Sequence, residues 1–261
     1  MENLEINVIP KFIDKAMSPV AESVGTTIAA LWKITFGGID IYAEKKHVER
    51  VNSLNQFKKE LESKISDIPV DKLLEPKLHI VGPSIEASKY YFENEELRSM
   101  FSNLIAASLN IDTSEKSHPA FVEIIKQLSP LDANNLSLFK AGRALPIAEY
   151  RLILENNGGY SVLKTHVFLE NPHIDNIDLI ASSMSNLLRL GLISIKYTEQ
   201  LKAVGSYDKL ENYPFFVNIK NILKNNIEVP IPMFIGCIDI TSQNGLVKVT
   251  PLGRDFISIC L

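Results

Sequence analysis

An ordered series of apolar stripes between Glu95 and Ala133 constrains the fold more than any other feature of this sequence. Apolar residues recur every three or four positions over 97–109 and again over 121–128, which is the spacing of one buried face on an α-helix. Pro119 and Pro130 suit the first turn of a helix, where a missing N–H does no harm. The segment therefore predicts two amphipathic helices and the start of a third, packed together.

The residues before this segment also have helical spacing. Ser18 before Pro19 is a typical N-cap, and we predict a helix over 10–36 whose inward stripe is Val24, Ile28, Leu31 and Ile34 or Thr35. A longer helix is expected over about 40–67, with Pro69 ending it and Glu60 on its solvent side. We therefore predict an all-helical domain over 1–134.

The pattern changes near residue 140. Residues 160–168 are typical of a strand, and 175–190 of a helix that Gly191 ends in the left-handed conformation. A strand is expected at 193–197. Two further strands, 234–240 and 246–250, are expected to form a hairpin through Asn244 and Gly245, the favoured pair for a tight turn.

This order resembles the recognition helix and wing of a winged-helix domain. We therefore predict a winged-helix-like α+β domain over 135–261, with an insertion near 196–232. The fold class expected for the whole chain is mainly α, with a helical domain followed by this α+β domain.

The composition gives no electrostatic argument for nucleic acid, because the formal net charge is −4 and neither half is polybasic. The only cysteines, Cys237 and Cys260, form no CxxC pair, so a disulfide framework and a zinc site are not indicated. Glu2 and Glu5 stand where a signal peptide would carry positive charge. We therefore expect a cytoplasmic protein.

No motif for a catalytic, cofactor or metal site is present. The sequence contains no GxxxxGK[ST], no GxSxG and no HExxH. His166 lies in a strand pattern and His173 in a turn, and both are interpreted as structural or surface residues. We therefore expect no catalytic residues, no cofactor and no metal, and hence a non-enzymatic protein.

Four residues are candidates for contacts with DNA or with a protein partner. Asn186 and Arg189 lie on the predicted 175–190 helix, Lys248 in the expected wing and Arg254 in the final helix. A DNA reader needs exposed polar side chains for bases and cations for phosphates. Because few cations are available, protein contacts are favoured over DNA.

The apolar window from Ser23 to Trp32 allows two interpretations. It spans about ten residues, whereas a membrane span needs roughly twenty. The helix over 20–36 could engage a membrane surface if it were released, or it could pack inside the protein. Its small residues favour close packing inside the protein. Because the window is too short, no transmembrane span is expected.

An ordered set of residues in this chain resembles the Abi-alpha family, a bacterial family that is associated with abortive infection as a defence against phage. The set begins with Pro83, Ile85, Glu95–Leu97 and Leu104–Ala106. The signature itself is His118, Pro119, Phe121, Val122, Ile125, Lys126, Gln127, Leu128, Ser129, Pro130, Asp132 and Ala133. The resemblance implies a role in defence against phage, and it brings no active site to carry over.

The sequence therefore predicts a non-enzymatic phage-defence protein that acts through protein–protein contacts, with self-association expected. One alternative is a DNA-binding regulator that uses the C-terminal domain. The other is a membrane-active effector that uses the 20–36 helix.

Overall fold

The structure is a computed structural model that describes residues 18–37, 44–155, 158–225 and 234–261. The chain divides into two compact units. The helical unit holds the residues up to Ala133 together with Asp255–Leu261, and the sheet unit holds Asn134–Arg254. Each unit is described separately below.

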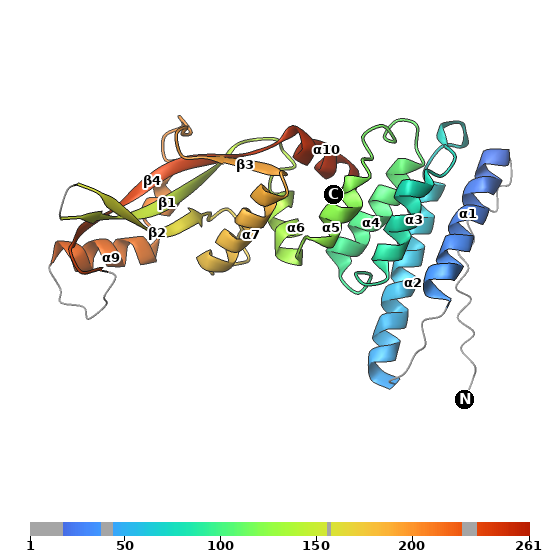
Figure 1. Ribbon diagram of the computed structural model, residues 1–261, viewed down its shortest axis with the longest axis horizontal. Helices are drawn as coiled ribbons and strands as arrows, with labels where there is room; N and C mark the ends of the chain where they lie inside the picture. The colour runs from blue at the N-terminus through green and yellow to red at the C-terminus, as the bar shows by residue number, and fades with distance from the viewer. Residues whose placement is uncertain (1–17, 38–43, 156–157, 226–233) are drawn as a thin grey trace. The chain divides into compact units, whose positions relative to one another are not determined.

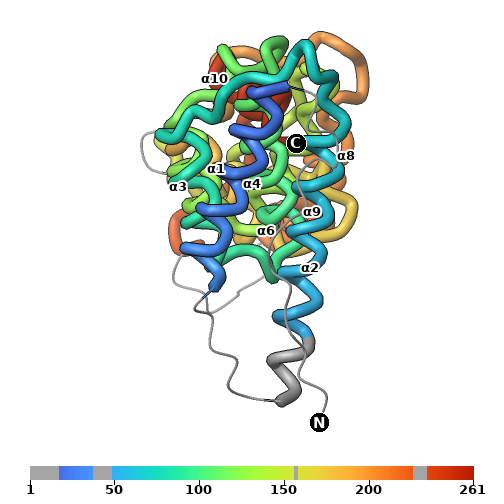
Figure 2. The backbone as a smooth tube through the Cα atoms, turned by 90° about the vertical axis from the view of Figure 1, so that its right-hand side faces the viewer, coloured from blue at the N-terminus to red at the C-terminus, as the bar shows by residue number. Residues whose placement is uncertain are grey.

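The helical unit is built from helices that lie roughly side by side (Figures 1 and 2). These are α1 (Pro19–Phe36), α2 (Glu44–Ser66), the short 3₁₀ helix η1 (Val70–Lys72), α3 (Leu78–Ser88), α4 (Glu95–Ser108), α5 (Ala120–Lys126) and the end of α10 (Pro251–Cys260). The sequence boundary between the two units falls within α6 (Pro130–Ser137). The predicted helix over 10–36 is observed from Pro19, and residues 10–17 lie outside the described residues.

Side-chain caps start three of the helices, including the one predicted after Ser18. The Ser18 Oγ accepts a hydrogen bond from the Ala21 N–H, and the Asn94 side chain caps α4 through the Leu97 N–H. At α6 the Ser129 N–H donates to the Asp132 carboxylate at 2.7 Å, and the Asp132 N–H donates back to the Ser129 Oγ. This reciprocal pair is a capping box. The helix start predicted at Pro130 is therefore confirmed.

The buried stripe of α1 differs from the predicted one near its end. Val24 and Ile28 are buried as expected, but Ile34 is 80% exposed. Trp32 and Phe36 are buried instead, and the Trp32 ring stacks on Phe57 of α2 with ring centroids 5.2 Å apart. Residues four apart lie on one helix face, and here the large aromatics decide which face packs inward.

The expectation that Glu60 is a solvated charge is wrong. Glu60 of α2 accepts two 2.9 Å contacts from the guanidinium of Arg98 on α4, and Arg98 is only 5% exposed. Lys64, one turn further along α2, donates to the Ser102 hydroxyl at 2.8 Å. A buried arginine needs a charged partner, so this pair ties α2 to α4.

The final turn of the chain belongs to the helical unit. Phe256 packs edge-on against Phe121, with centroids 5.2 Å apart. The Asn103 side-chain amide donates to the Cys260 carbonyl at 2.9 Å. The helices before Asn134 and the last turn of α10 therefore both belong to this unit, while the sheet unit lies between them in sequence.

The sheet unit contains a four-stranded antiparallel sheet in the order β2-β1-β4-β3. Its strands are β1 (Leu145–Leu154), β2 (Tyr160–Val167), β3 (Ile193–Lys196) and β4 (Cys237–Val249). Its helices are α7 (Ile177–Arg189), α8 (Asp208–Glu211) and α9 (Pro214–Lys224). The helix, strand and Gly191 turn predicted over 175–197 are confirmed, since Gly191 has a φ of 71° and the Leu192 N–H bonds the Leu187 carbonyl.

The predicted hairpin at Asn244–Gly245 is wrong. β4 runs without a break from Cys237 to Val249 and pairs with β1 along almost its whole length. No strand was predicted at the position of β1. The φ of Gly245 lies outside the left-handed region. A Cβ at Gly245 would lie 2.6 Å from the Lys196 carbonyl oxygen and 2.7 Å from the Tyr197 ring. The glycine is therefore needed for a close crossing and not for a turn.

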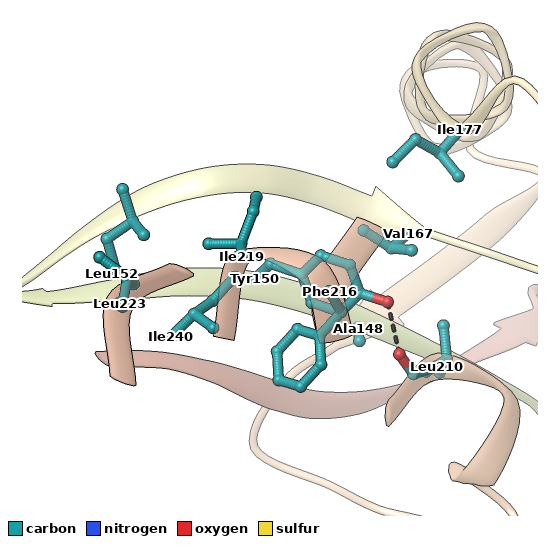
Figure 3. Close-up of a cluster of buried hydrophobic side chains, with 10 residues drawn as sticks. All are labelled: Ala148, Tyr150, Leu152, Val167, Ile177, Leu210, Phe216, Ile219, Leu223 and Ile240. Carbon is teal, nitrogen blue, oxygen red and sulfur yellow. Dashed lines mark hydrogen bonds between the residues drawn. The ribbon is translucent and has the colours of Figure 1, made fainter. Parts of the chain in front are cut away.

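One face of the sheet is covered by α8 and α9. Figure 3 shows Tyr150 and Leu152 of β1 packed with Phe216 and Ile219 of α9. The Tyr150 hydroxyl donates to the Leu210 carbonyl at 2.6 Å, so this buried phenol is satisfied. Burial raises the pKa of Tyr150 far above its usual range. Successive residues of a strand alternate faces, so Glu149 and Arg151 of β1 lie on the opposite face.

Replacing Gly245 with Ala should destabilise the protein. The new methyl group would overlap the Lys196 carbonyl and the Tyr197 ring, and overpacking of this kind lowers the free energy of unfolding by about 1–3 kcal/mol. The matched control is Gly159→Ala, where nothing lies within 4 Å and the backbone is outside the left-handed region, so the free energy of unfolding should change by no more than about 0.5 kcal/mol. Urea unfolding of both variants tests this, and equal stabilities for Gly245→Ala and the parent would contradict the crossing.

Candidate functional site

The four residues predicted as contacts lie in the sheet unit, and three of them already have partners there. The Arg189 guanidinium donates to the Asn186 side-chain oxygen at 2.7 Å on α7. Lys248 of β4 pairs with Glu199 at 3.2 Å, while Arg254 is exposed on α10. The Glu199 carboxylate also pairs with Lys196, and these two lysines lower its pKa. The positive charge available to a phosphate at Lys248 is therefore reduced.

Two exposed leucines flank the junction between the end of α7 and the start of α10. The Thr250 hydroxyl donates to the Gly191 carbonyl at 2.6 Å, and the Thr250 N–H donates to the Leu192 carbonyl. Leu188 lies in the last turn of α7 and Leu252 in the first turn of α10, and each is 38% exposed. We call Leu188 and Leu252 the leucine pair. Arg189 follows Leu188 directly, and Arg254 lies two residues after Leu252.

A second candidate site is a group of polar and aromatic side chains on the sheet face opposite α9. We call it the sheet cluster, and its members are Glu149, Arg151, Tyr160, His166, Tyr197 and Gln243. They come from β1, β2 and β4 and from the residue that follows β3. Glu149 lies directly opposite Gln243 in the β1–β4 ladder, so both belong to one face.

Arg151 is held in place from three directions. Its Nε donates to the Glu149 carboxylate at 2.7 Å and its Nη1 to the Gln243 side-chain oxygen at 3.0 Å. The Tyr160 ring lies 4.1 Å from the guanidinium carbon, a close cation–π contact. The side chains of Glu149 and Arg151 are 14% and 20% exposed, so the pair is only partly accessible to water.

A β-bulge places His166 in the sheet cluster. In the β1–β2 ladder Ala148 faces Val167 and Tyr150 faces Lys164, so Glu149 alone stands opposite both Thr165 and His166. His166 has a φ of 51°, and it is the one non-glycine residue with positive φ among the described residues. Bulges redirect side chains, and a non-glycine residue held in the left-handed backbone region carries strain.

Tyr197 crosses the sheet to reach His166. Its hydroxyl accepts a hydrogen bond from the His166 backbone N–H at 3.1 Å and lies 2.9 Å from Nδ1 of the same residue. The two rings are parallel to within 4°. The Gln243 amide donates to the Tyr197 carbonyl, and Gly245 leaves room for the ring. With Nδ1 engaged, Nε2 is the ring nitrogen left for another partner.

Burial sets the ionisation of this pair. Desolvation lowers the pKa of His166, and the negative charge of Glu149 opposes that shift. Desolvation likewise raises the pKa of Tyr197, against the effect of the hydrogen bond from the His166 N–H. Near neutral pH the imidazole is therefore mainly neutral and the phenol keeps its proton. A strained histidine, an acid and an arginine on one face form the strongest candidate site in the described residues.

Sequence reasoning missed the sheet cluster because its residues come from four separate segments. His166 was interpreted as structural, and Glu149, Arg151, Tyr160, Tyr197 and Gln243 were not singled out. The i, i+2 spacing of Glu149 and Arg151 was a usable signal once β1 was recognised as a strand. The bulge and the crossing by Tyr197 leave no pattern in a single sequence.

A hollow of about 320 Å³ also lies within the sheet unit, lined by Leu169, Asn171, Ile174, Asp175, Lys209, Asn212, Tyr213 and Pro214. The buried amide of Asn171 donates to Asn135 and accepts from the His173 N–H. Lys209 pairs with Glu170 at 3.2 Å. The hollow is a weaker candidate than the sheet cluster, because no histidine lines it that could exchange a proton near neutral pH.

The protonation of His166 should make stability depend on pH. Its pKa is lower in the folded protein than in the unfolded chain, so the unfolded chain binds more protons in that range and the free energy of unfolding falls with the pH. The loss begins below about pH 6.5, the ordinary value for histidine, and is complete below the folded pKa. For His166→Gln, the free energy of unfolding measured with urea should fall less between pH 7.5 and pH 5 than it does for the parent. Identical slopes for the variant and the parent would refute this.

Comparison with known proteins gave three findings. The family model described as Abortive infection alpha matches residues 49–260. No curated protein matches the chain. A solved structure, the uncharacterized protein from the hydrocarbon-degrading marine bacterium Alcanivorax borkumensis SK2, is 17% identical over 53% of this chain and 90% of its own, with a TM-score of 0.35. That score is too low to support any conclusion about fold or function.

Proposed function

This chain belongs to the abortive infection alpha family, which confirms the resemblance carried by the His118–Ala133 signature, and we propose that it acts in abortive infection through contacts with other proteins. Self-association is the first such contact to test. The family match is the observation that carries the proposal. The proposal requires no catalytic step, in line with the expectation of a non-enzymatic protein.

The leucine pair supports a protein partner. Leu188 and Leu252 remain partly exposed although the backbone beside them is fixed by the Thr250 hydrogen bonds. Exposed apolar side chains beside arginines are typical of protein interfaces, where arginine is enriched. We propose this junction, with Arg189 and Arg254 at its rim, as the contact surface.

The DNA-binding alternative has less support. In its favour, α7 is followed by β3, which pairs with β4, and a winged helix would have the same neighbours. Against it, Arg189 donates to Asn186 and Lys248 pairs with Glu199, so the candidate cations are partly neutralised. The counterion-release contribution to DNA affinity would be small.

The membrane-active alternative would require α1 to leave its packing site. Its apolar side chains Val24, Ile28, Trp32 and Phe36 are buried in the helical unit. No helix among the described residues is both long and apolar enough to cross a bilayer. Release would expose the Trp32 and Phe36 rings to water at a cost of a few kcal/mol.

Charged substitutions at the leucine pair test the proposal. In a host where the chain lowers phage plaque formation, Leu188→Asp with Leu252→Asp should restore plaques at least tenfold, because a buried carboxylate disrupts an apolar contact. The matched control is Val204→Asp, a fully exposed loop position at which protection should persist. Circular dichroism should confirm that both proteins fold. Full protection by the folded double variant would contradict this contact surface.

A further inference from the structure

We propose that the sheet cluster is a general acid–base site that cleaves the phosphodiester backbone of single-stranded RNA. This inference goes beyond the proposed function and would replace the expectation of a non-enzymatic protein. It rests on three side chains that the fold brings to one face, namely Glu149, His166 and Arg151.

The chemistry of the cluster points to the substrate class. It holds a carboxylate, an imidazole and a guanidinium, but none of its six members is a serine or cysteine that could attack a substrate. A general base such as Glu149 can activate either water or a hydroxyl group of the substrate itself. RNA offers the second route, because the ribose 2′-hydroxyl lies beside the phosphorus atom that it attacks. DNA has no 2′-hydroxyl and would not be cleaved.

Each group has one role in a balanced step. The Glu149 carboxylate takes the proton of the 2′-hydroxyl as the 2′-oxygen forms a bond to phosphorus. The bond from phosphorus to the 5′-oxygen of the next nucleotide breaks, and that oxygen receives a proton from Nε2 of the His166 imidazolium. The products are a 2′,3′-cyclic phosphate and a 5′-hydroxyl, with no oxidant, reductant or added nucleophile. The Arg151 guanidinium stabilises the charge on the phosphoryl oxygens.

The surroundings of these groups fit a single strand. Tyr160 is 52% exposed above Arg151 and offers its outer face to a nucleobase. Unpaired bases stack on aromatic side chains, whereas bases inside a duplex cannot reach a sheet face. Because Arg151 is the single cation in the cluster, binding should depend weakly on salt, and stacking must supply most of the affinity.

Tyr197 is a positioning residue in this scheme. Its hydroxyl holds Nδ1 and the backbone N–H of His166, so Nε2 points away from it. The acid role requires a protonated imidazole, and burial lowers the pKa of His166. Cleavage should therefore decline on the alkaline side of a maximum that lies below about pH 6.5. Tyr197→Phe should change this pH profile as well as the rate.

The test incubates the purified full chain with two oligonucleotides, one of RNA and one of the same sequence in DNA. RNA should be cut to cyclic-phosphate ends at pH 6, with and without chelator, and DNA should stay intact. Glu149→Gln and His166→Asn should each lower the rate by about 10²-fold or more. The matched controls are Glu155→Gln and His173→Asn, an exposed acid and an exposed histidine outside the cluster, and both should keep the parent rate.

Several results would overturn the inference. These are intact RNA, cleavage of both oligonucleotides, loss of cleavage in chelator, and equal rates for the parent and the two cluster variants. If a cluster variant fails to fold by circular dichroism, the pH profile of the parent decides, and a maximum above pH 7 refutes the acid role. The folded leucine-pair variant should cleave RNA normally, which separates this test from that of the contact surface.

Discussion

The hydrogen bonds between Tyr197 and His166 are the interaction on which the sheet face depends. They join the residue after β3 to β2, the two outer strands of the sheet, across β1 and β4. The crossing is feasible because Gly245 has no side chain beneath the ring. It also keeps the His166 ring beside Glu149 in spite of the strained backbone. One tyrosine thus links the packing of the sheet to the electrostatics of the candidate site.

The helical unit could be predicted from sequence because its determinants are local. Caps such as Ser18, Asn94 and the Ser129–Asp132 box act within one turn, and stripes such as 97–109 report a buried face directly. The errors there concern long-range choices. Neither the preference of α1 for Trp32 over Ile34 nor the pairing of Glu60 with Arg98 follows from spacing, because each depends on which helix lies opposite.

The sheet unit was harder to predict because strand pairing is not local. Asn244–Gly245 carries the strongest short-range signal for a hairpin, yet β1 supplies a long partner that keeps β4 straight through both residues. The same pairing places Gln243 beside Glu149 and creates the sheet cluster. Missing β1 therefore meant missing the cluster as well, and tertiary pairing overrode a local turn preference.

The central claim is that Tyr197 holds the ring of His166 in a partly buried position. Nitrogen NMR of the histidine side chains over a range of pH tests it directly, with the same chain unfolded in urea as the reference. The account predicts that His166 titrates at lower pH in the folded protein than in the unfolded chain, and that Tyr197→Phe shifts the Nδ1 resonance of His166 alone. Equal titration of His166 in the folded and unfolded chain, unchanged in Tyr197→Phe, would contradict it.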